Sequence, residues 1–155
     1  MTRRYGRSPR SDRLVEAVPA GHWKTTTLLG ALRVGSVPTA MVIDAPTNTE
    51  IFRAFIEQCL LRQLQPGDIV VMDNLAVHKA QGIVDIIESA GAQVRYLPAY
   101  SPDLNPIEKL WSKVKALLRK SKARDTPGLW KAIGQALDQV TPQDCQGFFR
   151  SCGYA

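Results

Sequence analysis

The stretch "DIVVMDNLAVHK", residues 68–79, changes from an apolar run to polar residues at Asp73. The unbroken apolar run 69–72, bounded by turn residues, predicts a central strand that is buried on both faces of a covered sheet. Asp73 then lies at the carboxyl end of that strand, the edge where an open α/β sheet binds ligands. The structural alternative is that Asp73 turns the chain and caps the next helix, and position alone favours this alternative.

The apolar periodicity of the rest of the chain predicts the other elements around this strand. Two strands joined at Gly35 form an antiparallel hairpin, and Pro66-Gly67 ends the helix that follows them. The predicted strands span 24–35, 37–44, 68–73 and 93–98, and the predicted helices span 47–64, 77–90, 106–121 and 127–139. The order β-β-α-β-α-β-α-α indicates an α/β fold with a mixed sheet and helices on both faces.

Composition limits the class of protein. The 155 residues are 45% hydrophobic and 22% charged, which suits one globular domain over residues 1–155. No apolar run approaches the roughly 18 residues of a membrane helix, and the basic start is not followed by a signal-peptide core. We therefore expect no membrane association, a cytoplasmic location and a basic N-terminal arm over residues 1–22. The three cysteines lack the spacing of a disulfide framework or a zinc site.

The positive charge is clustered within two segments. The net charge is +6, and basic residues concentrate at residues 3–13 and again at residues 109–124. Clustered positive charge attracts polyanions by releasing their counterions, so nucleic acid is a candidate partner. For either cluster alone, a solvated surface is the alternative.

The sequence "NPIE", residues 105–108, places a second carboxylate at a helix start. Asn105 suits the N-cap, Pro106 suits the first helical position, and Glu108 falls where a capping-box acid reaches back to the cap. Such a box would contribute ~1 kcal/mol without any chemistry. The helix dipole also favours an ionised carboxylate there, as a metal ligand requires. The local pattern does not choose between these two roles.

The run "IVVMD", residues 69–73, is also typical of the strand and acid of a nucleotide-hydrolase metal site. That interpretation requires a GxxxxGKS/T loop to hold the phosphates, and the chain has none. An unrelated nucleotide-binding α/β protein therefore remains a weak alternative, which saturable ATP binding would revive.

Long motifs surround both acids, and two further motifs precede them along the chain. These motifs are "RYGRSPR" (4–10), "AVPAGHWKTTT" (17–27), "GDIVVMDNLAVHK" (67–79) and "YLPAYSPDLNPIEKLWSKVK" (96–115). From about Tyr5 to Leu118 the chain resembles the DDE transposases of bacterial insertion sequences related to mariner elements. The resemblance implies a ribonuclease-H-like catalytic fold.

The resemblance also implies a metal site. In this family three acids hold two divalent ions, Mg²⁺ or Mn²⁺, for phosphoryl transfer to water or a 3'-hydroxyl. Carried over, Asp73 is the second acid and Glu108 is the third, and both offer the hard oxygen ligands that Mg²⁺ prefers. Contacts to DNA are expected from six residues, for which capping or solvated surface roles are the alternatives: His78, Lys79, Lys109, Lys113, Arg119 and Lys120.

The first acid of the family lies on an opening strand before the "RYGRSPR" region, and this chain does not include it. Asp44 is rejected as a substitute, because in a sheet of order 3-2-1-4-5 three interstrand steps of ~4.8 Å put it ~14 Å from Asp73. We expect a sheet without its first central strand and an incomplete metal site. The strand at 24–35 then pairs directly with 68–73, recruits the arm, or leaves a gap that exposes backbone groups.

Two functions follow as hypotheses. The first is the catalytic-domain part of a transposase that cuts and joins DNA at transposon ends and target, inactive in this chain alone. The second is a truncated or split-frame fragment that binds DNA or associates with itself or with full-length transposase and interferes with it. The family's N-terminal helix-turn-helix is also not found, so we expect weak sequence-specific DNA binding.

Overall fold

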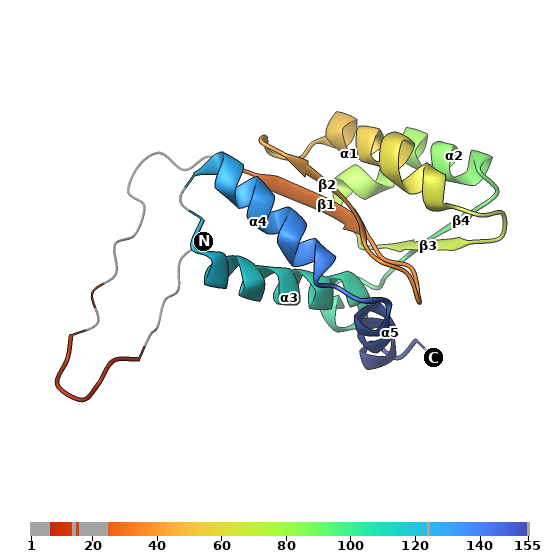
Figure 1. Ribbon diagram of the computed structural model, residues 1–155. Helices are drawn as coiled ribbons and strands as arrows, with labels where there is room; N and C mark the ends of the chain where they lie inside the picture. The colour runs from red at the N-terminus through yellow and green to blue at the C-terminus, as the bar shows by residue number, and fades with distance from the viewer. Residues whose placement is uncertain (1–6, 14, 16–24, 124, 155) are drawn as a thin grey trace.

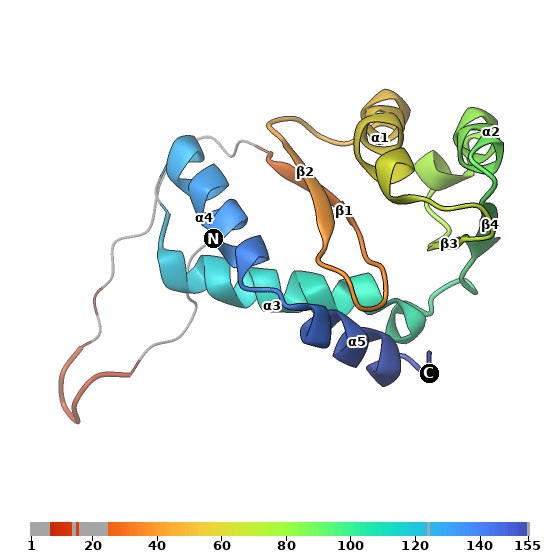
Figure 2. The same ribbon diagram turned by 45° about the vertical axis from the view of Figure 1, so that its right-hand side comes forward.

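The computed structural model describes residues 7–13, 15, 25–123 and 125–154, so most of the predicted arm over residues 1–22 lies outside the described residues. Strands lie between two groups of helices, α1 with α2 and α3 with α4 and α5 (Figures 1 and 2). This arrangement confirms the predicted α/β class, but in place of the predicted mixed sheet the described residues form one antiparallel pair and one parallel pair of strands. The elements are β1 (Thr27–Ala31), β2 (Thr39–Ile43), α1 (Thr49–Phe55), β3 (Ile69–Met72), α2 (Gln81–Ser89), β4 (Gln93–Tyr96), α3 (Pro106–Ser121), α4 (Thr126–Asp138) and α5 (Pro142–Ser151).

The predicted hairpin is confirmed, and it separates two hydrophobic cores. β1 and β2 pair antiparallel, with Leu28 opposite Val42 and Leu29 opposite Met41. Because neighbouring side chains on a strand point to opposite faces, the first pair packs against the α3–α4 core and the second against the α1–α2 core. Gly30 permits this packing, since a Cβ there would lie 2.7 Å from the Trp111 ring.

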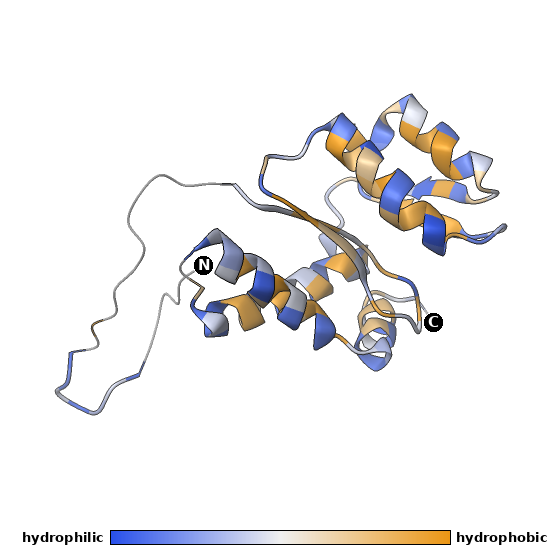
Figure 3. Cartoon of the chain, turned by 45° about the horizontal axis from the view of Figure 1, so that its top comes forward, coloured by the Kyte–Doolittle hydropathy of each residue, from blue (hydrophilic) through white to orange (hydrophobic). Residues whose placement is uncertain are grey.

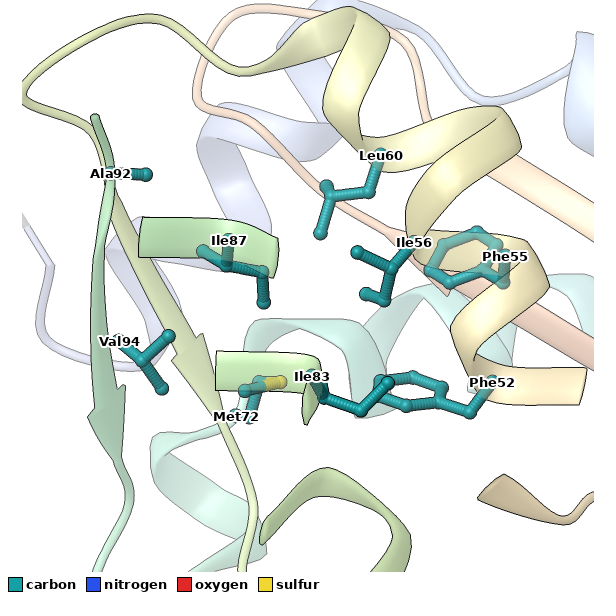
Figure 4. Close-up of a cluster of buried hydrophobic side chains, with 9 residues drawn as sticks. All are labelled: Phe52, Phe55, Ile56, Leu60, Met72, Ile83, Ile87, Ala92 and Val94. Carbon is teal, nitrogen blue, oxygen red and sulfur yellow. The ribbon is translucent and has the colours of Figure 1, made fainter. Parts of the chain in front are cut away.

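The core between α1 and α2 also receives one face of the second sheet. β3 and β4 pair in parallel, with Val70 opposite Val94. Their inward side chains meet the two helices in a cluster that Figure 4 shows in full: Phe52, Phe55, Ile56, Leu60, Met72, Ile83, Ile87, Ala92 and Val94. Burying one side chain of this size contributes about 1.5–3 kcal/mol.

The prediction that the 68–73 strand is buried on both faces is wrong. Ile69 and Val71 point away from α1 and α2 and are 60% and 45% exposed. The helices therefore cover both faces of the hairpin but one face of β3. An apolar run can thus mark a strand without showing how many layers cover it.

The two sheets are not joined to each other. Within the described ranges β1 pairs only with β2, and β3 only with β4. Direct pairing of the hairpin with β3 does not occur, and residues 7–13 form no strand. The two sheets share the apolar core under α1 and α2, and a polar contact also joins their ends: the Arg33 guanidinium binds the Asp68 carboxylate and donates to the Gln63 carbonyl at 2.9 Å. The Arg33 hydrogen bond lowers the pKa of Asp68.

The predicted helices differ from the observed ones in their regularity. The 106–121 helix is confirmed at both ends as α3, and 127–139 corresponds to α4. The 47–64 helix continues from α1 into a π turn (Ile56–Leu60) and a 3₁₀ turn (Leu61–Gln63). The 77–90 helix is divided, because Ala80 adopts ψ 124° between a 3₁₀ turn (Ala76–Lys79) and α2.

The last helix, α5, was not predicted from the sequence. Thr141 and Asp144 form a complete capping box at its start, and Cys145 is fully buried in the α3–α4 core. Figure 3 shows apolar residues on the inner sides of these helices and polar residues outside. None of the helices in the described ranges is long and apolar enough to cross a bilayer.

An ion pair between α3 and α5 predicts a pH effect on stability. Lys113 Nζ lies 2.5 Å from Asp144 Oδ2, and this bond, with the Thr141 backbone, lowers the pKa of Asp144. A lowered pKa stabilises the fold above the unfolded pKa, and the stabilisation is lost as pH falls through the folded value. Asp144→Asn should therefore cost ~1 kcal/mol at neutral pH and flatten the acid side of the stability curve.

Urea unfolding between pH 7 and pH 3 measures this effect. Glu57→Gln, at an exposed position of the π turn, is the matched charge control and should leave the curve unchanged. If Asp144→Asn ran parallel to the parent chain at every pH, the ion pair would contribute nothing.

Candidate metal centre

Asp73 directly follows β3 and controls the turn that leaves the sheet. Its Oδ1 accepts the Leu75 backbone N–H at 3.1 Å, which bends the chain into the 3₁₀ turn Ala76–Lys79. The turn considered for Asp73 is therefore confirmed, but the helix cap is wrong, because the 3₁₀ turn and α2 begin after Leu75 and Ala80 without a side-chain cap hydrogen bond. The hydrogen bond to Leu75 leaves part of the Asp73 carboxylate accessible, since this side chain is 42% exposed.

Glu108 lies in the first turn of α3, and the predicted capping box around it is wrong. The Asn105 side chain forms no cap hydrogen bond, because its own backbone carbonyl already accepts the Glu108 N–H at 3.1 Å. Among the described residues the Glu108 carboxylate forms no hydrogen bond or ion pair. Glu108 therefore has no capping role, and its exposed carboxylate lies at the helix start without a bonding partner among the described residues.

The two acids line one pocket. Its volume is about 250 Å³, and it lies where the end of β3 and the start of α3 meet. The remaining lining residues come from the loop after β3 and from the loop between β4 and α3: Asn74, Leu75, Leu97, Pro98, Tyr100, Ser101, Pro102 and Asn105. Residues remote in sequence thus place two carboxylates and two amides around one space.

The loop between β4 and α3 shapes this pocket. Tyr100 adopts φ 58°, a left-handed conformation that is uncommon for a residue with a side chain. Asn74 donates its side-chain N–H to the Leu97 carbonyl, so the ends of β3 and β4 are tied beside the acids. Asp73 and the loop that carries Glu108 are therefore held by the same sheet edge.

The donor set fits a hard divalent cation in part. Carboxylate and amide oxygens are the ligands that Mg²⁺ and Mn²⁺ prefer. Across the residues that the structure describes, no cluster of three acidic, histidine or cysteine side chains could hold a metal. Asp44 accepts a hydrogen bond from Thr26 at the end of the hairpin and does not line the pocket.

The basic residues considered for DNA contact lie in different places. Lys79 and Lys109 are exposed. Lys79 ends the 3₁₀ turn that follows Asp73, and Lys109 is next to Glu108 in α3. Lys79 Nζ lies 5.9 Å from the Tyr96 ring centre. Arg119 and Lys120 are exposed at the other end of α3, about 17–18 Å along the helix from Glu108 at ~1.5 Å per residue. Lys113 is bonded to Asp144. Sequence spacing alone did not separate these groups.

His78 has surroundings that the sequence did not reveal. Its side chain is 17% exposed and Nδ1 lies 2.7 Å from Asp73 Oδ1. The imidazole stacks on Phe52, with ring centres 4.4 Å apart. The signal for this contact is a tertiary one, because Phe52 belongs to α1.

A mixed α/β domain with paired acids at a sheet edge is typical of metal-dependent nucleases. The chain belongs to the DDE superfamily endonucleases, whose family model matches residues 1–129. It is 26% identical over 142 residues to the transposable element Tc1 transposase of Caenorhabditis elegans, covering 84% of this chain and 50% of that protein. These findings confirm the resemblance to DDE transposases of the mariner type.

Two solved structures show the same fold. The Mos1 strand transfer complex matches with a TM-score of 0.74 at 18% identity, over 98% of this chain and 47% of that one. The Mos1 transposase paired-end complex with left transposon end matches with a TM-score of 0.70 at 17% identity, over the same shares. The chain thus spans about half the length of the relatives it matches.

Proposed function

We propose that this chain forms the catalytic portion of a DDE transposase, which cuts and joins DNA strands by metal-dependent phosphoryl transfer. The observation that carries the proposal is the single pocket shared by Asp73 and Glu108. Family membership supports it, as do relatives whose names are those of transposases and of their complexes with transposon ends. The substrates are then DNA at the element ends and at the target.

Asp73 and Glu108 would hold Mg²⁺ or Mn²⁺ between the end of β3 and the start of α3. When bound, such ions activate an attacking hydroxyl and stabilise the leaving oxygen of an in-line displacement. The chain itself contributes position: the Leu75 N–H orients one carboxylate, and the first turn of α3 holds the other at the same pocket. Lys79 and Lys109, both exposed, would contact the flanking phosphates.

We further propose that the site needs a third carboxylate, which none of the residues that the structure describes brings to this pocket. Two features of the sheets support this proposal. Within the described residues the hairpin and the β3–β4 pair are separate, and β3 pairs with β4 along one edge while its other edge has no strand partner. A strand that ends in an acid and lies between β1 and β3 would join the sheets and complete the site. A nicking assay with and without that strand tests the function.

The second candidate function is a DNA-binding subunit that interferes with full-length transposase or associates with itself. The exposed cations at the far end of α3 favour it, because they lie away from the acids. The locations that follow are the cytoplasm and, when bound to DNA, the nucleoid.

This second function predicts DNA binding that is independent of the acids. Arg119→Gln with Lys120→Gln should lower the slope of log affinity against log salt by about 2, since each phosphate contact contributes ~0.9. Asp73→Asn and Glu108→Gln should leave the slope unchanged. Fluorescence anisotropy with a labelled duplex measures the slope between ~50 and ~200 mM salt, the range over which such affinities fall steeply. A slope insensitive to the α3 substitutions would argue against this surface.

A further inference from the structure

We infer that His78 is a positioning residue that fixes the orientation of the Asp73 carboxylate. His78 Nδ1 is buried and lies 2.7 Å from Asp73 Oδ1. The two atoms are within hydrogen-bond distance but do not meet hydrogen-bond geometry, and within the described part of the chain Nδ1 has no hydrogen-bond partner. Because buried polar atoms are normally hydrogen-bonded, we assign the adjacent Asp73 Oδ1 to this nitrogen as its acceptor after a small reorientation.

His78 is held from two other elements, its ring by one and its backbone by the other. Phe52 of α1, 5% exposed, stacks against the ring with an interplanar angle of 38°. The Tyr96 hydroxyl of β4 donates to the His78 backbone carbonyl at 3.0 Å. His78 therefore transmits the position of α1 and β4 to Asp73. This positioning role is distinct from the DNA contact expected for His78, which stays a prediction.

The contacts of Asp73 select one of its oxygens. The Leu75 N–H and His78 Nδ1 both approach Oδ1, whereas Oδ2 forms no hydrogen bond with any described residue. The carboxylate is thus held with Oδ2 available to the pocket, as a ligand that binds through one oxygen requires. Outer partners of this kind orient metal ligands and commonly change metal affinity about 10–100-fold. The metal consequence rests on the proposed function, but the orientation does not.

Two substitutions separate the hydrogen bond from the ring packing. His78→Phe keeps an aromatic ring on Phe52 and removes the donor, whereas His78→Asn keeps an N–H near the Nδ1 position and removes the ring. The first readout is the Leu75 amide signal in ¹H–¹⁵N NMR spectra of the metal-free chain, because that N–H binds Asp73 Oδ1. The second is the Mn²⁺ affinity from paramagnetic broadening.

The expected result is that His78→Phe shifts the Leu75 amide and weakens Mn²⁺ binding about 10-fold, while His78→Asn remains close to the parent chain in both. The reverse order would overturn the inference, since it would mean that His78 acts by packing alone. Unchanged values in both variants, combined with weaker DNA binding, would also overturn it in favour of a phosphate contact.

A complementary variant covers the case in which His78→Phe does not fold. Asp73→Asn should change the His78 Nδ1 resonance in long-range ¹H–¹⁵N spectra, and an unchanged resonance would contradict the contact. Neither NMR readout needs metal or DNA. A failure of the proposed function would remove Mn²⁺ binding but leave the Leu75 and His78 signals as expected.

Discussion

Residues 1–155, incubated with supercoiled plasmid and Mg²⁺ or Mn²⁺, should produce no nicks above background. Asp73 and Glu108 share a pocket, but no third acidic side chain joins them among the described residues. Two carboxylates leave a two-ion site underligated, because each Mg²⁺ needs several oxygen ligands and enough negative charge to hold it. Gel analysis of the nicked and supercoiled forms measures the result.

Adding the proposed third carboxylate should restore the activity. An extended chain carrying an apolar strand that ends in aspartate should nick at least about a thousand-fold faster, since groups that act as a unit lose most of their effect when one is removed. Asp73→Ala and Glu108→Ala should each abolish the gain. Asp44→Ala is the matched acid control and should retain it.

The opposite outcome would be equally informative. Strong cleavage by residues 1–155 alone, dependent on both Asp73 and Glu108, would contradict the proposal that the site is incomplete. Circular dichroism of each variant would show that a loss of cleavage is not a loss of fold.

Local patterns predicted the elements whose limits are set locally. Pro106 fixes the start of α3, and its apolar stripe at Leu110, Val114 and Leu118 is fully used in the core. The hairpin followed from two β-rich runs around Gly35, whose φ of 72° suits the turn. In each case neighbouring residues determine the structure, so one sequence suffices.

Features that depend on competition between hydrogen-bond acceptors, or on contacts between distant segments, were not predictable. The Asn105 cap lost its role because a backbone carbonyl takes the same N–H. The exposure of Ile69 and Val71 depends on which helices cover the sheet. An apolar run carries no information about that arrangement.

Some features of the candidate site could be predicted from the sequence and others could not. The two acids could be identified from their motifs, and the structure brings both to one pocket. The engagement of Lys113 by Asp144 and the stacking of His78 on Phe52 join segments whose pairing no local pattern encodes. Charge and motif identify candidate residues, whereas their partners require the fold.

Mn²⁺ titration of the ¹⁵N-labelled chain tests most directly whether Asp73 and Glu108 bind the same divalent ion. Shared coordination predicts that the amide signals of Leu75 and Ile107, beside the two acids, broaden at the same Mn²⁺ concentration. Asp73→Asn or Glu108→Gln alone should then abolish the broadening of both signals, while Asp44→Asn should change neither. If each substitution removed only the broadening beside it, the two carboxylates would bind separate ions and the account would be contradicted.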